Sequence, residues 1–360
     1  MAVPMFDPKE ITEVKTISFG GRTQTIFNYP CSQREGILAT YRREPYWTVS
    51  SFTSMFSPKV NPDNIARGFV YEAGSRDLKV SDYGGPDMFG IEWEYIESVG
   101  GSMVRPGKPY IEDANEIKDK IVFPDVDKWD WEGSAEANKA YLRPDNANCM
   151  WFLNGWYERL ISFMDFEGAI MALIDEDQQD AVHEFFGRLS DLYIKILDHA
   201  IKAYPQIDMF CIHDDWGSQK ETFFAPAVAE EMIVPYMKVV TDFLHSKGKY
   251  CDFHCCGNNM KQIPNMIKAG WDSWCPQAMN DTAKEYELYG DKIIIGVMPK
   301  AFDPKTAPEE EQRASARDFV DRFMQPGKPA TINFNAMGML TPAFNEALYE
   351  YSRKKCCGMI

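Results

Sequence analysis

The residues best suited to chemistry lie in one short stretch, from Lys249 to Gly257, which reads KYCDFHCCG. Side chains on a strand point alternately to its two faces, so His254 and Cys256 share one face while Cys255 points to the other. An imidazole and a thiolate held two residues apart are typical ligands of zinc, which in catalytic sites takes three protein ligands and keeps one position open. This pair therefore predicts a zinc site that needs a third ligand from elsewhere in the chain.

Polar side chains also follow other predicted strands at the point where each strand ends. Apolar runs predict strands over 207–213, 250–254, 271–275 and 330–334, most of them separated by helical segments. Because the carboxyl ends of barrel strands meet on one face, residues far apart in the sequence should become neighbours there. Loops are polar in any protein, but this explains His254, Cys256 and the pair Asp214-Asp215 less well. The residues singled out are Asp214, Asp215, Trp216, Gln219, His254, Cys256, Cys275, Gln277 and Asn335.

The elements that must position these residues alternate between strand and helix. From residue 148 onward we expect a strand over 148–155, helices over 156–164 and 177–203, the strand 207–213, and a helix over 225–247. Strand, helix and strand in repeated order imply right-handed parallel crossovers. No G-x-G-x-x-G fingerprint is present, so we favour an α/β fold of the closed (β/α)8 TIM-barrel type over a doubly wound sheet.

The first 80 residues are harder to interpret. Asn61 followed by Pro62 predicts a helix start, with Asn61 as the cap and Pro62 at the first helical position. We expect residues 1–80 to form an N-terminal extension packed on the barrel. Residues 81–360 are then expected to form the barrel itself.

Composition and charge restrict the class of protein. Of the 360 residues, 45% are hydrophobic and 26% are charged, which is typical of soluble globular proteins. The formal net charge of -16 and the pI of about 4.8 argue against nucleic acid and anionic membranes as partners. The amino-terminal residues resemble no export signal and no run approaches a membrane span, so we expect a cytoplasmic protein. Nine cysteines, an odd number, are then expected to be free thiols.

The ordered motifs Asp214-Asp215-Trp-Gly-Ser-Gln219, His254-x-Cys256-Gly257-Asn258 and Pro276-Gln277 resemble those of the uroporphyrinogen decarboxylase superfamily. Within it, the chain looks most like the cobamide-dependent methyltransferases of anaerobic methyl metabolism, and the similarity runs from Asp82 to Met324. This resemblance implies a (β/α)8 barrel that works with a corrinoid protein. It also implies zinc held by the His-x-Cys pair and by a later cysteine.

The sequence departs from this pattern at two places. The methylcobamide:thiol methyltransferases of the family carry their last zinc cysteine near the end of the final strand, where this chain reads Asn333-Phe-Asn-Ala-Met-Gly338. As the third ligand we favour Cys275, at the end of the next predicted strand, with Asp214 or Asp215 as alternatives. The decarboxylases bind propionates through an arginine-rich amino-terminal segment that Arg42-Arg43 does not match, so porphyrinogen decarboxylation is not expected.

The candidate catalytic acids are Glu158, Asp214 and Asp215. A methyl ether is inert because alkoxide or phenoxide leaves poorly, and zinc or a carboxylic acid stabilises charge on the oxygen while cobalt(I) attacks the methyl carbon. Simpler roles stay open for two of them, because Asp214 suits a helix N-cap and Glu158 suits the first turn of a helix. The candidate substrate-binding residues are Trp216, Gln219, Gln277 and Asn335.

The resemblance thus implies a corrinoid-dependent methyltransferase, the O-demethylase component that moves a methyl group between a small substrate and the cobalt of a corrinoid protein. An aromatic content of 14% favours a methoxylated aromatic substrate, with Zn²⁺ as the Lewis acid. Three alternatives stay open: a metal-independent decarboxylase of a cyclic or aromatic acid, methyl transfer from methylcorrinoid to a thiol or folate, and a non-catalytic corrinoid-protein binder. A homo-oligomer is compatible with the sequence.

Overall fold

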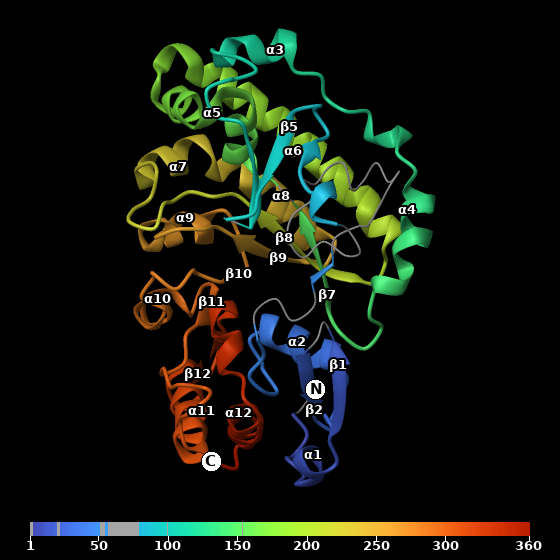
Figure 1. The fold of residues 1–360 in the computed structure, drawn as a ribbon, viewed down its shortest axis with the longest axis vertical. Helices are drawn as coiled ribbons and strands as arrows, with labels where there is room; N and C mark the ends of the chain where they lie inside the picture. The colour runs from blue at the N-terminus through green and yellow to red at the C-terminus, as the bar shows by residue number, and fades with distance from the viewer. Residues whose placement is uncertain (1–2, 20–21, 51–54, 57–78, 99, 153) are drawn as a thin grey trace. The chain divides into compact units, whose positions relative to one another are not determined.

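The computed structural model describes residues 3–19, 22–50, 55–56, 79–98, 100–152 and 154–360 (Figure 1). The predicted helix start at Asn61 and Pro62 lies outside these residues. The chain divides into two compact units. The first unit comprises residues 1–54, 144–147 and 272–360, and the second comprises residues 55–143 and 148–271. The predicted division at residue 80 stays a prediction.

The second unit is built on a parallel sheet. Its strands are β3 (Met55–Phe56), β7 (Asn148–Phe152), β8 (Ile207–His213) and β9 (Tyr250–His254), in the order β3-β7-β8-β9. The strands predicted over 207–213 and 250–254 are confirmed at the same bounds. Their register pairs His213 with His254, so the last residues of β8 and β9 lie side by side.

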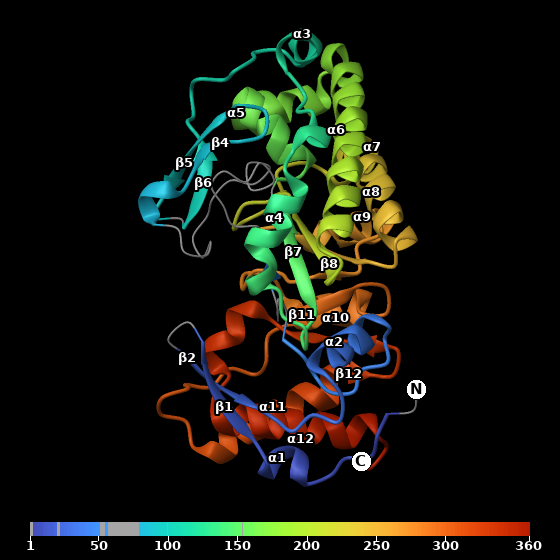
Figure 2. The same cartoon turned by 90° about the vertical axis from the view of Figure 1, so that its right-hand side faces the viewer.

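Helices follow these strands as the alternation predicts (Figure 2). The helices are α5 (Trp156–Ile174), α6 (Glu176–Ala203), α7 (Pro226–Met232), α8 (Val234–Ser246) and α9 (Ile263–Lys268). The single helix predicted over 225–247 is instead two helices that meet at Ile233. Pro235 explains this break, because proline lacks the N–H that a continuous helix would use there.

The two faces of the parallel sheet have different neighbours. Phe152 of β7 packs edge-to-face on Tyr193 of α6, with ring centroids 4.9 Å apart. On β9, Phe253 stacks on Trp271 at 4.9 Å. Because side chains alternate along a strand, the residues next to these phenylalanines, Trp151 and His254, point to the opposite face.

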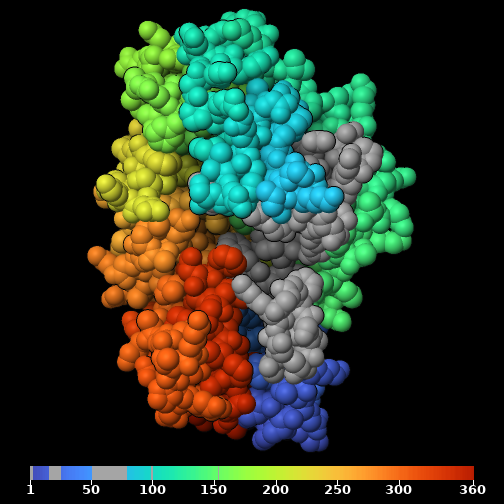
Figure 3. Space-filling model, in the orientation of Figure 1, coloured from blue at the N-terminus to red at the C-terminus, as the bar shows by residue number. Residues whose placement is uncertain are grey.

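A small antiparallel sheet completes the second unit, and Figure 3 shows it in cyan at the surface. It consists of β4 (Gly85–Pro86), β5 (Glu92–Ile96) and β6 (Gly101–Val104). Asp87, just after β4, forms a 2.7 Å ion pair with Arg159 of α5, and both side chains are fully buried. Further helical segments of this unit are η2 (Val80–Asp82), η3 (Ala114–Glu116), α3 (Ile117–Lys120), η4 (Val126–Lys128), α4 (Trp131–Asn138), η5 (Lys139–Tyr141) and η6 (Met260–Gln262).

The first unit contains its own parallel strands. These are β10 (Ser273–Trp274), β11 (Ile294–Val297) and β14 (Thr331–Ile332), in the order β14-β11-β10. Its other elements are α1 (Lys9–Thr12), β1 (Lys15–Phe19), β2 (Arg22–Ile26), α2 (Gln33–Tyr41), α10 (Thr282–Tyr289), α11 (Glu309–Phe323), β12 (Met324–Gln325), β13 (Lys328–Pro329), η7 (Phe334–Met339) and α12 (Pro342–Cys356). Across the described ranges of both units, no helix combines the length and apolar character needed to span a membrane.

Glu285 of α10 provides a test of the first unit. Its side chain is fully buried, neither carboxyl oxygen has a hydrogen-bond partner, and burial, helped by Asp281, raises its pKa to about 8. Because this value lies above the ordinary 4.5, the contribution of Glu285 to stability is fully present below about pH 4.5 and is lost as the pH rises through about 8. Between pH 5 and pH 8 the ionisation of Glu285 is expected to lower the unfolding free energy of the wild type by roughly 3 kcal/mol. Glu285→Gln has no group to ionise at this position, so it should not show this decrease.

Urea unfolding at a series of pH values measures this difference. Glu287→Gln is the matched control, because Glu287 lies on the same helix with its side chain exposed. Parallel pH profiles for the wild type and Glu285→Gln would contradict the prediction.

Candidate functional site

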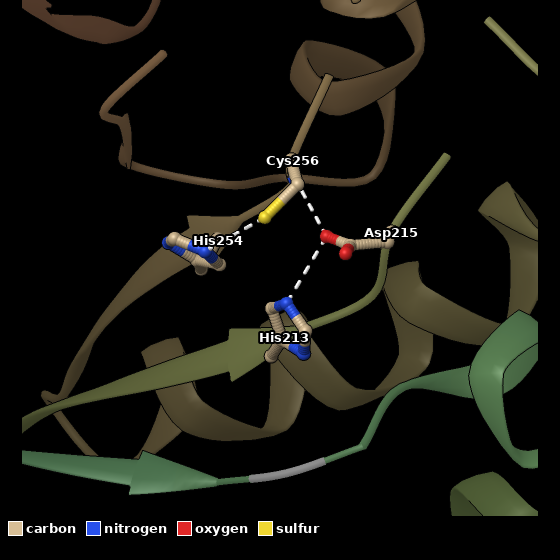
Figure 4. A group of neighbouring side chains, drawn as sticks. All are labelled: His213, Asp215, His254 and Cys256. Carbon is tan, nitrogen blue, oxygen red and sulfur yellow. Dashed lines mark hydrogen bonds and ion pairs between the residues drawn. The ribbon is translucent and has the colours of Figure 1, made fainter. Parts of the chain in front are cut away.

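Four side chains from two neighbouring strands converge at one place in the second unit (Figure 4). They are His213, Asp215, His254 and Cys256, and their potential ligand atoms all lie within 4.8 Å of one another. The two histidines end β8 and β9, and the aspartate and the cysteine each follow two residues later. The predicted pair of His254 and Cys256 is thus together, and we call these four residues the His/Asp/Cys group.

Short contacts hold the group together. His213 Nε2 lies 3.0 Å from Asp215 Oδ1, and the same oxygen accepts a 2.6 Å hydrogen bond from the backbone N–H of Cys256. Cys256 Sγ lies 3.4 Å from His254 Nε2. Most of these atoms come from strand ends or from residues just beyond them, so the sheet itself fixes their spacing.

The protonation of the group follows from its burial and its charges. Burial lowers the pKa of His254 to about 3, with the His213 charge acting in the same direction. Burial likewise raises the pKa of the Cys256 thiol to about 11. For His213, burial opposes the charged form, but the carboxylates of Glu158 and Asp215 outweigh it and raise its pKa well above the usual range. The group thus holds a charged His213, a neutral His254 and a protonated thiol, and a bound metal would displace one proton from His213 and the proton of the thiol.

The donor set suits zinc. Two imidazoles, one thiolate and one carboxylate give the nitrogen, sulfur and oxygen ligands that Zn²⁺ takes in proteins. Four such donors satisfy a tetrahedral ion, and a catalytic zinc takes three protein ligands and leaves its fourth position to water or substrate. The residues present therefore fit the metal that the sequence predicts.

Glu158 contacts the ring nitrogen of His213 that does not face Asp215. Its Oε2 is 3.0 Å from His213 Nδ1, and it also accepts a 3.0 Å hydrogen bond from Asn154 Nδ2. The contact with His213 is electrostatic, because Nδ1 makes no aligned hydrogen bond. Glu158 is thus placed to hold the imidazole in position, as carboxylates do behind the metal-binding histidines of other proteins.

Asp214 caps a helix that lies far from it in the sequence. Its carboxylate accepts hydrogen bonds from the backbone N–H groups of Tyr157 and Glu158, at 3.2 and 2.9 Å, and from Trp216 Nε1 at 3.0 Å. Burial and the nearby Glu158 raise its pKa to about 7. A Cβ on Gly155 would lie 2.3 Å from that of Asp214, so only glycine fits at the start of α5. The aspartate caps α5, which precedes it in the sequence.

The other predicted site residues lie in different surroundings. Trp216 is fully buried, and Gln219 is exposed in the loop that follows β8. Cys275, Gln277 and Asn335 belong to the first unit. There Cys275 Sγ accepts a 3.4 Å hydrogen bond from the N–H of Phe334, and Asn335 is exposed in η7. The roles predicted for these five residues stay predictions.

His213 is the residue that sequence reasoning missed. It ends a correctly predicted strand, as His254 does, but it carries no motif of its own. Two histidines at the ends of consecutive parallel strands were the available signal, since such strands pair side by side. Its partner across the ladder, His254, has its ring centroid 4.8 Å away.

Comparisons with known proteins agree with these observations. A family model of uroporphyrinogen decarboxylase (URO-D) matches residues 148–334, which is more than half of the chain. Among solved structures, a methyltransferase from Methanosarcina mazei has a TM-score of 0.57 and 15% identity, covering 90% of this chain and 99% of that chain. No curated protein matches the chain.

Two other solved structures are more distant. A xylose isomerase-like TIM barrel protein from Mycobacterium smegmatis, in complex with magnesium, has a TM-score of 0.34 and 10% identity, covering 86% of this chain and 98% of that chain. The IOLI protein with a binding zinc atom has a TM-score of 0.29 and 10% identity, covering 70% of this chain and 89% of that chain. Scores this low support no conclusion about the present chain.

The family match and the fold shared with the Methanosarcina mazei methyltransferase together confirm the predicted fold class, an α/β barrel of the (β/α)8 type. The His/Asp/Cys group at the ends of β8 and β9 lies within the matched residues. This chain belongs to the uroporphyrinogen decarboxylase (URO-D) family.

Proposed function

We propose that this protein is a corrinoid-dependent methyltransferase. It would move a methyl group between a small methylated substrate, a methoxylated arene, and the cobalt of a corrinoid protein. The observation that carries this proposal is the His/Asp/Cys group, a zinc-type donor set at the carboxyl ends of two strands of a URO-D family barrel. The fold shared with a methyltransferase supports the choice of reaction.

The proposed reaction breaks one bond and forms one bond. The methyl carbon–oxygen bond of the ether breaks, a cobalt–carbon bond forms, cobalt(I) becomes methylcobalt(III), and the phenolate that leaves takes up a proton. Zinc would supply Lewis acidity at the ether oxygen. His254, Cys256 and His213 would hold it, with Asp215 at the position that a substrate can take.

The proton-handling role belongs to Glu158 in this proposal. Its carboxylate is partly accessible, with 13% of the side chain exposed, and it contacts His213. The oxygens of Asp214, in contrast, are occupied by two backbone N–H groups and an indole N–H. We therefore assign Asp214 to positioning α5, which differs from the sequence expectation that Asp214 is a catalytic acid.

A transfer assay tests the function. The purified protein is mixed with a cobalt(I) corrinoid protein and, in separate reactions, with methoxylated arenes, methanol and a methylthiol. Conversion of the cobalt(I) spectrum to that of methylcobalt(III) is the expected result. No conversion with any donor would overturn the proposal. Decarboxylation of an aromatic acid by metal-free protein would overturn it in favour of the decarboxylase alternative.

The third zinc ligand can be assigned by substitution. We expect His213→Ala to lower the zinc content well below one ion per chain and Cys275→Ser to leave it unchanged, because His213 is within 4.8 Å of the other ligand atoms. Elemental analysis of the dialysed proteins measures this. The opposite pattern would support the sequence prediction of Cys275.

A further inference from the structure

Trp151 of β7 points to the same face of the sheet as the His/Asp/Cys group. Its neighbour Phe152 faces α6, where it packs on Tyr193, so the alternation of side chains turns Trp151 to the opposite face. The ring contacts agree with this orientation. The Trp151 ring centroid lies 4.9 Å from that of His254 and 6.0 Å from that of His213.

Trp151 also differs from the phenylalanines of β7, β8 and β9. Phe152, Phe210 and Phe253 have no exposed surface, whereas Trp151 is partly exposed. An indole that only filled space behind the histidines would be expected to be as fully covered as these phenylalanines, because each exposed Å² of apolar surface costs about 25 cal/mol. A partly exposed tryptophan beside a metal-type group is suited to an apolar, flat ligand.

We propose that Trp151 is the specificity-determining residue on which the aromatic ring of the substrate stacks. This inference rests on the proposed function, in which the substrate is a methoxylated arene, and names the residue that binds the ring of that substrate. A ring stacked on Trp151 would lie close to the His/Asp/Cys group, since the centroid of the indole is 4.9 Å from that of His254. A donor without a ring gains nothing from this contact.

Calorimetry tests ring binding without any corrinoid. The zinc-loaded protein is titrated with 4-methoxyphenol and, separately, with methanol. Trp151→Leu keeps an apolar side chain but removes the ring, so we expect it to bind 4-methoxyphenol about 10- to 100-fold more weakly than the wild type. Trp131→Leu is the matched control, because Trp131 of α4 is also partly exposed and also stacks on a histidine, His199, at 4.9 Å. Equal affinity in Trp151→Leu and the wild type would overturn the inference.

A second variant distinguishes loss of arene binding from loss of the folded site. Trp151→Phe keeps a ring beside the two histidines, and we expect it to retain zinc. It also removes the indole fluorescence that a stacked arene quenches. Loss of the quenching in this variant, with zinc retained, places the arene at residue 151, and undiminished quenching places it elsewhere and overturns the inference.

The transfer assay separates this inference from the proposed function. With the corrinoid protein present, Trp151→Leu should raise KM for 4-methoxyphenol about 10- to 100-fold, whereas the control Trp131→Leu should leave this KM at the wild-type value. Binding of the arene at Trp151 without transfer from any donor would support the inference and refute the function. Transfer from arenes that is equally efficient in Trp151→Leu would do the reverse.

Discussion

Replacing His254 by alanine is expected to remove the bound zinc and to lower the rate of methyl transfer by more than about 100-fold. Residues that only support a metal ligand already cost about 10- to 100-fold when changed, so loss of a ligand should cost more. His254 is part of a group whose donors lie within 4.8 Å of one another. Without His254, only His213 and Cys256 would hold the ion once a substrate takes the position of Asp215, and a catalytic zinc takes three protein ligands. Elemental analysis and the rate of methylcobalt(III) formation measure the two effects.

Adjacent cysteines provide the control for this experiment. Cys256→Ser should behave like His254→Ala, because its Sγ lies 3.4 Å from His254 Nε2. Cys255→Ser should keep its zinc, because Cys255 is buried on the other side of the strand end, where its Sγ accepts a hydrogen bond from the N–H of Trp216 at 3.3 Å. One zinc per chain and full activity in both His254→Ala and Cys256→Ser would show that the site is not a metal centre.

Replacing Asp87 by alanine is expected to lower the free energy of unfolding by about 3–5 kcal/mol. The substitution leaves the Arg159 guanidinium buried without its carboxylate, and an unpaired buried charge is costly. Asp87 also accepts hydrogen bonds from the N–H groups of Phe89 and Ile91, at 2.9 and 3.0 Å, and from Trp93 Nε1 at 3.0 Å. The Asp87 carboxylate thus connects the small antiparallel sheet to α5, the helix that contains Glu158.

Chemical denaturation of the zinc-loaded protein measures this loss. The double variant Asp87→Leu with Arg159→Met should be more stable than Asp87→Ala alone, because it removes both charges. Asp127→Ala is the control, since Asp127 is exposed and its ion pair with Lys195 should contribute little. A change of less than about 1 kcal/mol in Asp87→Ala would contradict the prediction.

Local patterns were sufficient to predict the strands that carry the site. The strands 207–213 and 250–254 have the predicted bounds, because a short buried strand is a continuous apolar run that ends at polar residues. The long helix α6 begins one residue before its predicted start, since its buried residues recur at helical spacing. The pairing of His254 with Cys256 follows from the alternation of side chains within one strand and its continuation, and needs no tertiary information.

Roles that depend on partners far away in the sequence could not be predicted in this way. Asp214 caps α5 through hydrogen bonds that reach back 56 and 57 residues, whereas a sequence pattern shows only the helix that follows an aspartate. The burial of Trp216 likewise depends on packing against Phe224 and Phe253. Hydrogen bonds and packing across such distances are decided by the tertiary fold.

Patterns in the sequence were enough to predict the family resemblance, the barrel fold and the donors His254 and Cys256, and they offered Asp215 as an alternative third ligand. Only the tertiary structure brought in His213 and put Trp151 beside the same group. The physical reason is the register of the parallel strands: it pairs His213 with His254, and hydrogen bonds between strands 37 or more residues apart set this register. A pattern within one strand cannot contain that information.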